Sequence, residues 1–206
     1  SRRQRQMCIR DRDILIGDVW LCSGQSNMQW VVNNVTNAEV EKKNANYSQI
    51  RTLNIPRRME LSPKDTISTT WLVCSPETVG RFSGVAYFFA RKVYEETNIP
   101  IGIINSSWGG TIVETWTSLE AANTLPQKRL DRYNKNEKLS PPTEYFTRTN
   151  KEAKRNDYPS LVYNAMIHPL LSFAIKGVVW YQGENNVGNA VSYTHLRAHE
   201  TEADLV

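Results

Sequence analysis

The sequence predicts an α/β fold, a three-layer α/β/α sandwich built around a parallel sheet. Short apolar runs rich in β-branched residues alternate along the chain with segments of helical pattern, as in strands joined by crossover helices. Three of these runs end in turns rich in glycine, serine and amide side chains, at residues 14–28, 101–111 and 177–186. Because the carboxyl ends of parallel strands lie at one edge of a sheet, the three turns are expected to meet there and form a ligand-binding site.

The first part of the chain supplies two of the predicted strands. The first is the apolar run at residues 14–22, which is expected to be largely buried. A helix is expected around residues 37–44, and the second strand is predicted at residues 50–55, where a proline closes it. The segment 59–76, which carries Trp71, is expected to be irregular.

A capped helix and a third strand are predicted next. Ser83 is a suitable N-cap, and the helix is expected to run to about Thr97, before an Asn-Ile-Pro sequence. The third strand is predicted at residues 101–105, and a capping-box pattern at residues 117–120 predicts a short helix. The apolar stripe of the first of these helices is expected to comprise Val85, Phe88, Phe89 and Val93.

The rest of the chain contains a predicted insertion and the last strand. Residues 123–158 are rich in Lys, Arg, Asn and Glu and are expected to form a solvated insertion. The helical pattern at residues 160–173 is expected to break near His168, because Pro169 cannot continue a helix. The fourth strand is predicted at residues 175–181.

The composition is that of an ordinary globular domain. Of the 206 residues, 40% are hydrophobic and 22% charged, and no apolar run approaches the length of a membrane span. The formal net charge of +4 lies mainly in residues 1–12 and 127–155 and forms no patch that would bind nucleic acid. We therefore expect neither a nucleic-acid nor a membrane partner. Three cysteines without regular spacing predict no disulfide framework and no metal site, and no cofactor is expected.

Both ends of the sequence are unusual. Residues 1–12 and 191–206 lack apolar periodicity and resemble peptides translated from sequencing adapters. We expect these ends to be foreign to the natural protein, which places the domain at residues 13–190. The alternative is an ordinary frayed terminus at each end, and genomic sequence through the locus would distinguish the two.

Ser26 is the first candidate for a catalytic role. It follows the first predicted strand in a Gly-Gln-Ser-Asn-Met sequence, where a serine hydroxyl projects from the edge of the sheet. Backbone N–H groups of the following turn would point at the oxyanion that forms when this hydroxyl attacks an acyl carbonyl. A Gly-x-Ser turn alone is common and often only reverses the chain. The two other polar turns favour the catalytic interpretation.

Three separated motifs give the sequence a family resemblance. They are Gly-Gln-Ser-Asn-Met at 24–28, Trp-Gly-Gly-Thr at 108–111 and Trp-Tyr-Gln-Gly-Glu at 180–184. Together they resemble the SGNH-hydrolase superfamily, and more narrowly its sialate O-acetylesterase and carbohydrate acetylesterase branch. The resemblance implies an SGNH or flavodoxin-like sheet, here incomplete, and a serine carbohydrate O-acetylesterase that acts on acetylated sugars or glycans through an acyl-serine. It also implies a secreted or periplasmic parent protein with a β-rich domain before residue 13.

The resemblance implies roles for individual residues. Ser26 would be the nucleophile, and the oxyanion would bind the backbone N–H groups of Ser26 and Gly110. A side-chain amide would be the third donor, from Gln182 or Asn185, and the pattern of this branch favours Gln182. Glu184 would either orient a catalytic histidine or hydrogen-bond the loop after Ser26. The candidate substrate-binding residues are Asn27, Trp108, Gly109 and Asn185.

Two of these side chains, and that of the nearby Trp116, also suit structural roles. Asn27 is expected to brace its turn rather than to touch substrate. Trp108 and Trp116 would be able to flank a sugar ring, although buried packing is the commoner fate of tryptophan.

The sequence departs from the family at the general base. The family places a histidine three residues after an aspartate, beyond the third motif, and no Asp-x-x-His occurs in this sequence. His195 and His199 lie in the C-terminal segment that looks foreign, and His168 is expected to be packed and hydrogen-bonded. The chain is therefore expected to be a fragment that lacks its catalytic histidine and hydrolyses esters poorly.

Two other functions stay open. A non-catalytic carbohydrate-binding module of the same fold would keep the pocket without the base, whereas a downstream Asp-x-x-His would favour the enzyme. A phosphate or nucleotide binder would use the turn at residues 108–111 to hold an anion at a helix N-terminus. Against the second alternative, the sequence contains neither a Gly-x-Gly-x-x-Gly fingerprint nor a Walker pattern.

Overall fold

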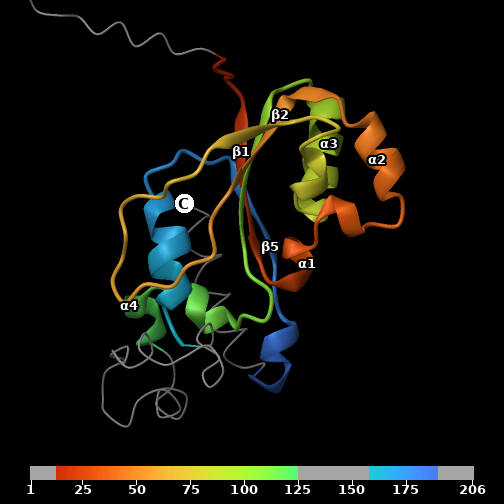
Figure 1. The fold of residues 1–206 in the computed structure, drawn as a ribbon. Coiled ribbons are helices and arrows are strands. Elements are labelled where there is room, and N and C mark those ends of the chain that lie inside the picture. The colour runs from red at the N-terminus through yellow and green to blue at the C-terminus, as the bar shows by residue number, and fades with distance from the viewer. Residues whose placement is uncertain (1–12, 125–157, 190–206) are drawn as a thin grey trace, which may run out of the picture.

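The computed structural model describes residues 13–124 and 158–189, and at its centre is a sheet of five strands in the order β3-β2-β4-β1-β5. Figure 1 shows helices on both sides of this sheet. The predicted class, a three-layer α/β sandwich, is confirmed. Residues 1–12, 125–157 and 190–206 lie outside the described part, and with them most of the predicted insertion and both of the ends that look foreign.

Four strands of the sheet are parallel. β1 (Asp18–Gly24) pairs with β4 (Ile101–Ser107) on one side and β5 (Gly177–Tyr181) on the other, and β4 also pairs with β2 (Tyr47–Asn54). β3 (Trp71–Cys74) forms the edge next to β2 and is antiparallel to it. The four strands that the sequence predicts pair in parallel, as expected, but the expectation that residues 59–76 are irregular is wrong at β3. β3 is antiparallel because the chain returns from β2 without the crossover helix that a parallel strand needs.

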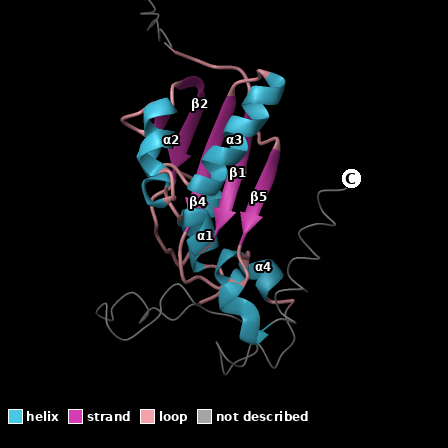
Figure 2. Cartoon of the chain, turned by 90° about the vertical axis from the view of Figure 1, so that its right-hand side faces the viewer, coloured by secondary structure: helices cyan, strands magenta, loops and turns pink. Residues whose placement is uncertain are grey.

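Helices cover both faces of the sheet. α1 (Ser26–Gln29), α2 (Ala38–Asn44) and α3 (Gly84–Thr97) lie on one face, in front of the strands in Figure 2. η3 (Val113–Trp116) and the π-helical η6 (Tyr163–Ile167) pack on the other face. The shorter helical turns are η1 (Val32–Asn34), η2 (Val79–Arg81), α4 (Leu119–Ala122), η7 (His168–Leu170) and η8 (Glu184–Asn189).

Each face of the sheet has its own hydrophobic core, because successive strand side chains point to opposite faces. On the face of α3, Ile50, Ile101 and Ile103 of the sheet pack with Tyr87 and Ala90 of the helix. Full burial of one such aliphatic side chain contributes roughly 1.5–3 kcal/mol. The core on the opposite face comprises Leu53, Ile55, Ile104, Trp116, Val162, Ala165 and Met166.

The predicted ends of α3 are confirmed, but its apolar stripe needs correction. Ser83 Oγ accepts a hydrogen bond from Ala86 N at 3.2 Å, and Asn98 ends the helix in the left-handed region with a φ of 53°. The buried side chains are those of Ala86, Tyr87 and Ala90, because small alanines let the helix lie close to the sheet. The larger predicted side chains are only half-buried and flank this contact: Val85, Phe88, Phe89 and Val93.

Two other boundaries differ from the expectation. β1 begins at Asp18 rather than at residue 14, since Ile14 and Ile16 precede the sheet and are 67% and 92% exposed. α4 is capped by Ser118, whose Oγ accepts a hydrogen bond from Ala121 N at 3.1 Å, rather than by residue 117. Farther along the chain, η6 gives way to the 3-10 turn η7 beside Pro169, where the proline predicted a break.

Cys22 and Cys74 are buried free thiols, and their low reactivity is a testable consequence of this core. Burial raises the pKa of each thiol from 9.0 to about 12. At pH 8 this lowers the thiolate fraction about 10³-fold. In a Cys8→Ser background, we therefore expect an aromatic disulfide reagent to react about 10³-fold more slowly with the native than with the urea-unfolded protein.

The same pKa shifts predict how stability depends on pH. The pKa of each thiol is higher in the folded than in the unfolded protein. The two protonated, buried thiols therefore contribute their full stabilisation below about pH 9, and this stabilisation is lost as the pH rises toward 12.

The reactivity prediction has a clear contrary outcome. Native thiols that react with the disulfide reagent within tenfold of the unfolded rate at pH 8 would contradict the packing of this core.

Candidate active site

Three polar turns meet at one edge of the sheet. The Ser26 turn (residues 25–28) follows β1, the Gly110 turn (108–113) follows β4 and the Glu184 turn (182–186) follows β5. In the register of the sheet, the last residues of these three strands lie opposite one another. Figure 2 shows β1 and β5 ending together at this edge, close to α1.

Gly24 makes the close approach of β1 and β5 possible. Its φ is +137°, and a Cβ at this position would overlap the carbonyl oxygen of Tyr181. The next residue, Gln25, donates its backbone N–H to the same oxygen at 3.0 Å. The buried Oε1 of Gln25 accepts the N–H groups of Gly183 at 3.3 Å and Asn185 at 3.4 Å. Gln25 therefore ties the end of β1 to the Glu184 turn.

Ser26 is exposed at the start of α1, and the Gly110 turn passes beside it. Trp108 N donates to the carbonyl oxygen of Gly24 at 3.0 Å, and Gly109 N donates to Gln29 Oε1 at 2.5 Å. A Cβ on Gly109 would lie 3.5 Å from both Cα and Cβ of Ser26. These contacts place the double-glycine sequence directly against the candidate nucleophile.

Gly110 and Asn185 lie across the site from each other. Gly110 has a left-handed backbone with a φ of +77°. The atom nearest to a Cβ built on it is Nδ2 of Asn185, at 3.9 Å. Both residues are exposed, so the structure brings this side-chain amide to the glycine that was expected to donate to an oxyanion.

Gln182 is placed differently from the expectation that it donates to an oxyanion. It is buried, and its Nε2 donates to the carbonyl oxygen of Thr111 at 3.2 Å and to Asn186 Oδ1 at 2.6 Å. An amide nitrogen has two hydrogens, and these two acceptors engage both of them. The geometry therefore favours Asn185, the alternative that the sequence left open, over Gln182.

Glu184 contacts the Ser26 turn. Asn27 Nδ2 donates a hydrogen bond to Glu184 Oε1, and both side chains are exposed. This contact matches the interpretation in which Glu184 bonds the loop after Ser26 and Asn27 braces it. Orientation of a histidine by Glu184 stays a prediction.

Two buried polar residues behind the turns are not among the site residues that the sequence predicts. Glu114 is 2% exposed and Asn186 is 1% exposed, and Asn186 Nδ2 donates to Glu114 Oε2 at 2.9 Å. Asn186 Oδ1 also accepts the backbone N–H of Val113 at 2.9 Å. The available signal was a single glutamate in the otherwise uncharged segment 111–118, because a carboxyl group buried there must find a partner.

The tryptophans near the site pack into the core. Trp116 is 3% exposed, its Nε1 donates to Thr111 Oγ1 at 2.8 Å, and its ring meets that of Trp180 edge-on with centroids 5.9 Å apart. This burial excludes the stacking of a sugar on Trp116. Trp108 is half-buried and packs against the same core, so only part of its side chain is accessible.

His168 is packed and hydrogen-bonded, as expected. Its Nδ1 lies 2.9 Å from the carbonyl oxygen of Lys64, and its ring lies 6.2 Å from that of Tyr163. These partners belong to the segment before β3 and to η6, not to the three turns. His168 is therefore not placed as a base for Ser26.

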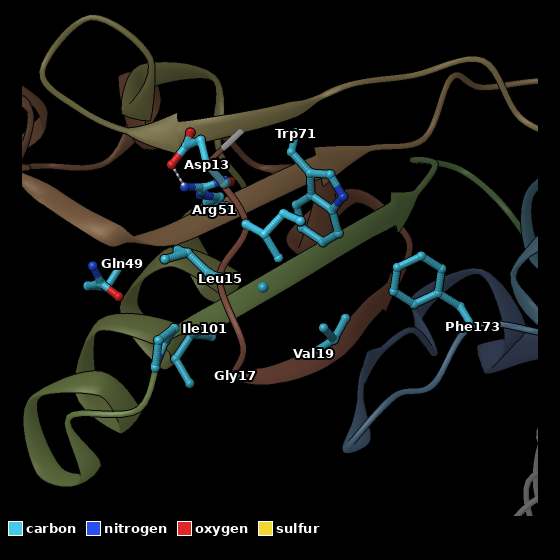
Figure 3. Close-up of a pocket in the computed structure, with 12 residues that line it drawn as sticks. Asp13, Leu15, Gly17, Val19, Gln49, Arg51, Trp71, Ile101 and Phe173 are labelled. Carbon is cyan, nitrogen blue, oxygen red and sulfur yellow. Dashed lines mark hydrogen bonds and ion pairs between the residues drawn. The ribbon is translucent and has the colours of Figure 1, made fainter. Parts of the chain in front are cut away.

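A separate cavity of about 410 Å³ lies near the amino ends of β1 and β4 (Figure 3). Trp71, Gly102 and Phe173 line it, and Arg51 pairs with Asp13 at its border at 2.5 Å. None of its lining residues belongs to the three turns, so the cavity is no part of the candidate active site. In the described part of the chain, no three His, Cys, Asp or Glu side chains gather as metal ligands would.

No helix within residues 13–124 and 158–189 is both long and apolar enough to cross a bilayer.

The fold and the three turns define an α/β domain of the SGNH-hydrolase type, with a serine turn, a double-glycine turn and an amide-rich turn at the ends of neighbouring parallel strands. A family model described as carbohydrate esterase, sialic acid-specific acetylesterase, matches residues 16–199. The chain belongs to this family of carbohydrate esterases.

Individual relatives agree with the family. The sialate O-acetylesterases of Pongo abelii and Homo sapiens are 39% and 38% identical over 191 residues, which cover 87% of this chain and 33% of each relative. The crystal structure of a carbohydrate acetylesterase from Xanthomonas citri matches with a TM-score of 0.72 at 33% identity, over 88% of this chain and 36% of that chain. The chain thus spans about a third of the length of these relatives.

Proposed function

We propose that this chain carries the nucleophile and the oxyanion site of a serine carbohydrate O-acetylesterase. The observation that carries the proposal is the meeting of the three turns, with Gly109 against Ser26 and Gly110 opposite Asn185. The proposed substrate class is an acetylated sugar, in particular O-acetylated sialic acid, because the relatives are named sialate O-acetylesterase.

The chemistry follows from these placements. Ser26 Oγ attacks the carbonyl carbon of the acetyl ester while a general base takes the hydroxyl proton. The negative oxygen of the tetrahedral intermediate accepts hydrogen bonds from the backbone N–H groups of Ser26 and Gly110 and from the amide of Asn185. The C–O bond to the sugar then breaks, the sugar oxygen takes the proton from the base, and acetyl-Ser26 is left. Water attacks the acetyl group, which releases acetate and restores the serine.

The remaining site residues hold or border the substrate in this proposal. The contact between Asn27 and Glu184 keeps the Ser26 turn in place against the turn after β5. Gly109 lets an acyl group approach the backbone beside the nucleophile, because it has no side chain. The exposed part of Trp108 borders the sugar.

The general base is the missing component of this mechanism. The Asp-x-x-His sequence of the family does not occur in the 206 residues, and His168 is engaged with Lys64. We propose that these residues lack the catalytic histidine. An unassisted serine is a weak nucleophile, so the 206-residue chain is expected to hydrolyse p-nitrophenyl acetate less than about tenfold faster than its Ser26→Ala variant. Vigorous turnover that depends on Ser26 would refute the missing base and leave the nucleophile in place.

The proposed function is tested on the full-length protein, expressed from its complete gene. With O-acetylated sialic acid as substrate, we expect release of acetate and of the free sugar, measured by chromatography. Binding of the sugar without release of acetate would instead support the alternative, a non-catalytic carbohydrate-binding module of the same fold.

A further inference from the structure

We infer that Glu114 and Asn186 are positioning residues, a buried pair that holds the Gly110 turn and the Glu184 turn in the arrangement that binds the oxyanion. The inference rests on the proposed function, since it concerns the same site. Both residues are almost completely buried, at 2% and 1% exposed, so neither is placed to touch a substrate. Their effect passes through the residues that they hold.

Glu114 carries a carboxyl group that is buried inside the protein. It lies in η3 next to the buried residues Val113 and Thr115, and a carboxyl group buried without a partner would be strongly destabilising. The partner in the structure is Asn186 Nδ2, 2.9 Å from Oε2. Because the carboxyl oxygen accepts this hydrogen bond, it fixes which end of the Asn186 amide faces Glu114.

The orientation of Asn186 then determines the contacts of its other end. Oδ1 accepts the backbone N–H of Val113 at 2.9 Å and the side-chain Nε2 of Gln182 at 2.6 Å. Gln182 Nε2 also donates to the carbonyl oxygen of Thr111 at 3.2 Å. If the Asn186 amide rotated by half a turn, its NH₂ group would face these two donors and both hydrogen bonds would be lost. The acceptor at Glu114 therefore keeps the two turns connected.

The connected residues adjoin the two proposed oxyanion donors. Thr111 follows Gly110 in the chain, and Asn186 follows Asn185 and closes its own turn by donating its backbone N–H to Gly183 O at 2.9 Å. A shift of either turn changes the separation of Gly110 and Asn185 across the site. Oxyanion donors act mainly on the transition state, so such a shift lowers kcat more than it raises KM.

A swap of the amide and the carboxyl group tests the inference in the full-length protein. Asn186→Asp places two carboxyl groups face to face, and we expect kcat to fall about 100-fold while KM changes less than about threefold. Adding Glu114→Gln restores the bond in the opposite direction, because the new amide at position 114 donates to the new carboxylate at position 186. The other carboxylate oxygen still accepts from Val113 and Gln182. The double variant is expected to recover kcat to within about fivefold of the original protein.

Asn164→Asp is the matched control. Asn164 lies in η6 and is also buried, at 4% exposed, but its Nδ2 donates to the carbonyl oxygen of Glu60 at 3.0 Å, and Glu60 belongs to none of the three turns. We expect this control to lower the thermal midpoint of unfolding and to leave kcat within about twofold, because a purely structural loss does not move the oxyanion donors.

The outcomes separate this inference from the proposed function. A folded Asn186→Asp variant with kcat within threefold of the original overturns the positioning role, and so does a folded double variant that recovers no activity. If Asn186→Asp does not fold, Gln182→Met takes its place with an expected tenfold fall in kcat, and an unchanged kcat overturns the role. Turnover that survives Ser26→Ala rejects the proposed nucleophile itself.

Discussion

Replacing Ser26 by alanine in the full-length protein is expected to lower kcat for acetyl-ester hydrolysis by about 10⁴-fold or more, because no acyl-serine forms without the hydroxyl. The side chain is exposed, so the free energy of unfolding should change by less than about 0.5 kcal/mol. Initial rates with an O-acetylated sugar, together with urea denaturation, measure both quantities on one preparation.

Ser48→Ala is the control for this substitution. Ser48 is another exposed serine, near the amino end of β2 and therefore at the other end of the strands from the three turns. It should keep both kcat and stability. Equal activities of the Ser26→Ala and Ser48→Ala variants would remove Ser26 from the mechanism.

Replacing Gly24 by alanine is expected to cost roughly 3 kcal/mol or more of the free energy of unfolding. The backbone φ of +137° is unfavourable for any residue with a side chain, and the added Cβ would overlap Tyr181 O. To relieve this overlap, β1 and β5 must separate at the edge where the Ser26 and Glu184 turns meet. The variant should therefore lose both stability and activity.

Gly110→Ala provides a comparison in which only the backbone conformation matters. Its φ of +77° is also left-handed, but the nearest atom to an added Cβ lies 3.9 Å away. The expected cost is about 1–2 kcal/mol, which is the strain of the conformation alone. Linear extrapolation of urea unfolding measures both variants. A Gly24→Ala variant no less stable than Gly110→Ala would contradict the close approach of β1 and β5.

Features set by local sequence were predicted well. The cap of α3 requires only that Ser83 precede an apolar helix, and its end requires only Asn98 before a proline sequence. The convergence of the three turns also followed from the sequence, because parallel strands all end at one edge. The prediction of Ser26 as an exposed residue at that edge has the same origin.

Features that depend on tertiary packing were predicted less well. β3 is a strand because it pairs with β2, from which an irregular segment of chain separates it, and no local sequence pattern predicted this pairing. In the sequence Gln-Gly-Glu-Asn-Asn, three amide side chains follow β5 within five residues. The turn buries Gln182 and Asn186 and leaves Asn185 exposed. This choice depends on the hydrogen-bond partners that the Gly110 turn offers to Gln182 and Asn186, and the local sequence does not reveal them.

The central claim is that Ser26 is a nucleophile and that hydrogen-bond donors from all three turns bind the oxyanion formed by its attack. Covalent labelling tests this claim most directly. An alkyl fluorophosphonate reacts with an activated serine by forming a P–O bond and losing fluoride, and the product resembles the tetrahedral intermediate. In the full-length protein, peptide mass spectrometry should find one adduct, on the peptide that contains Ser26, and none in the Ser26→Ala variant. An adduct on a different serine, or labelling that persists after Ser26→Ala, would contradict the account.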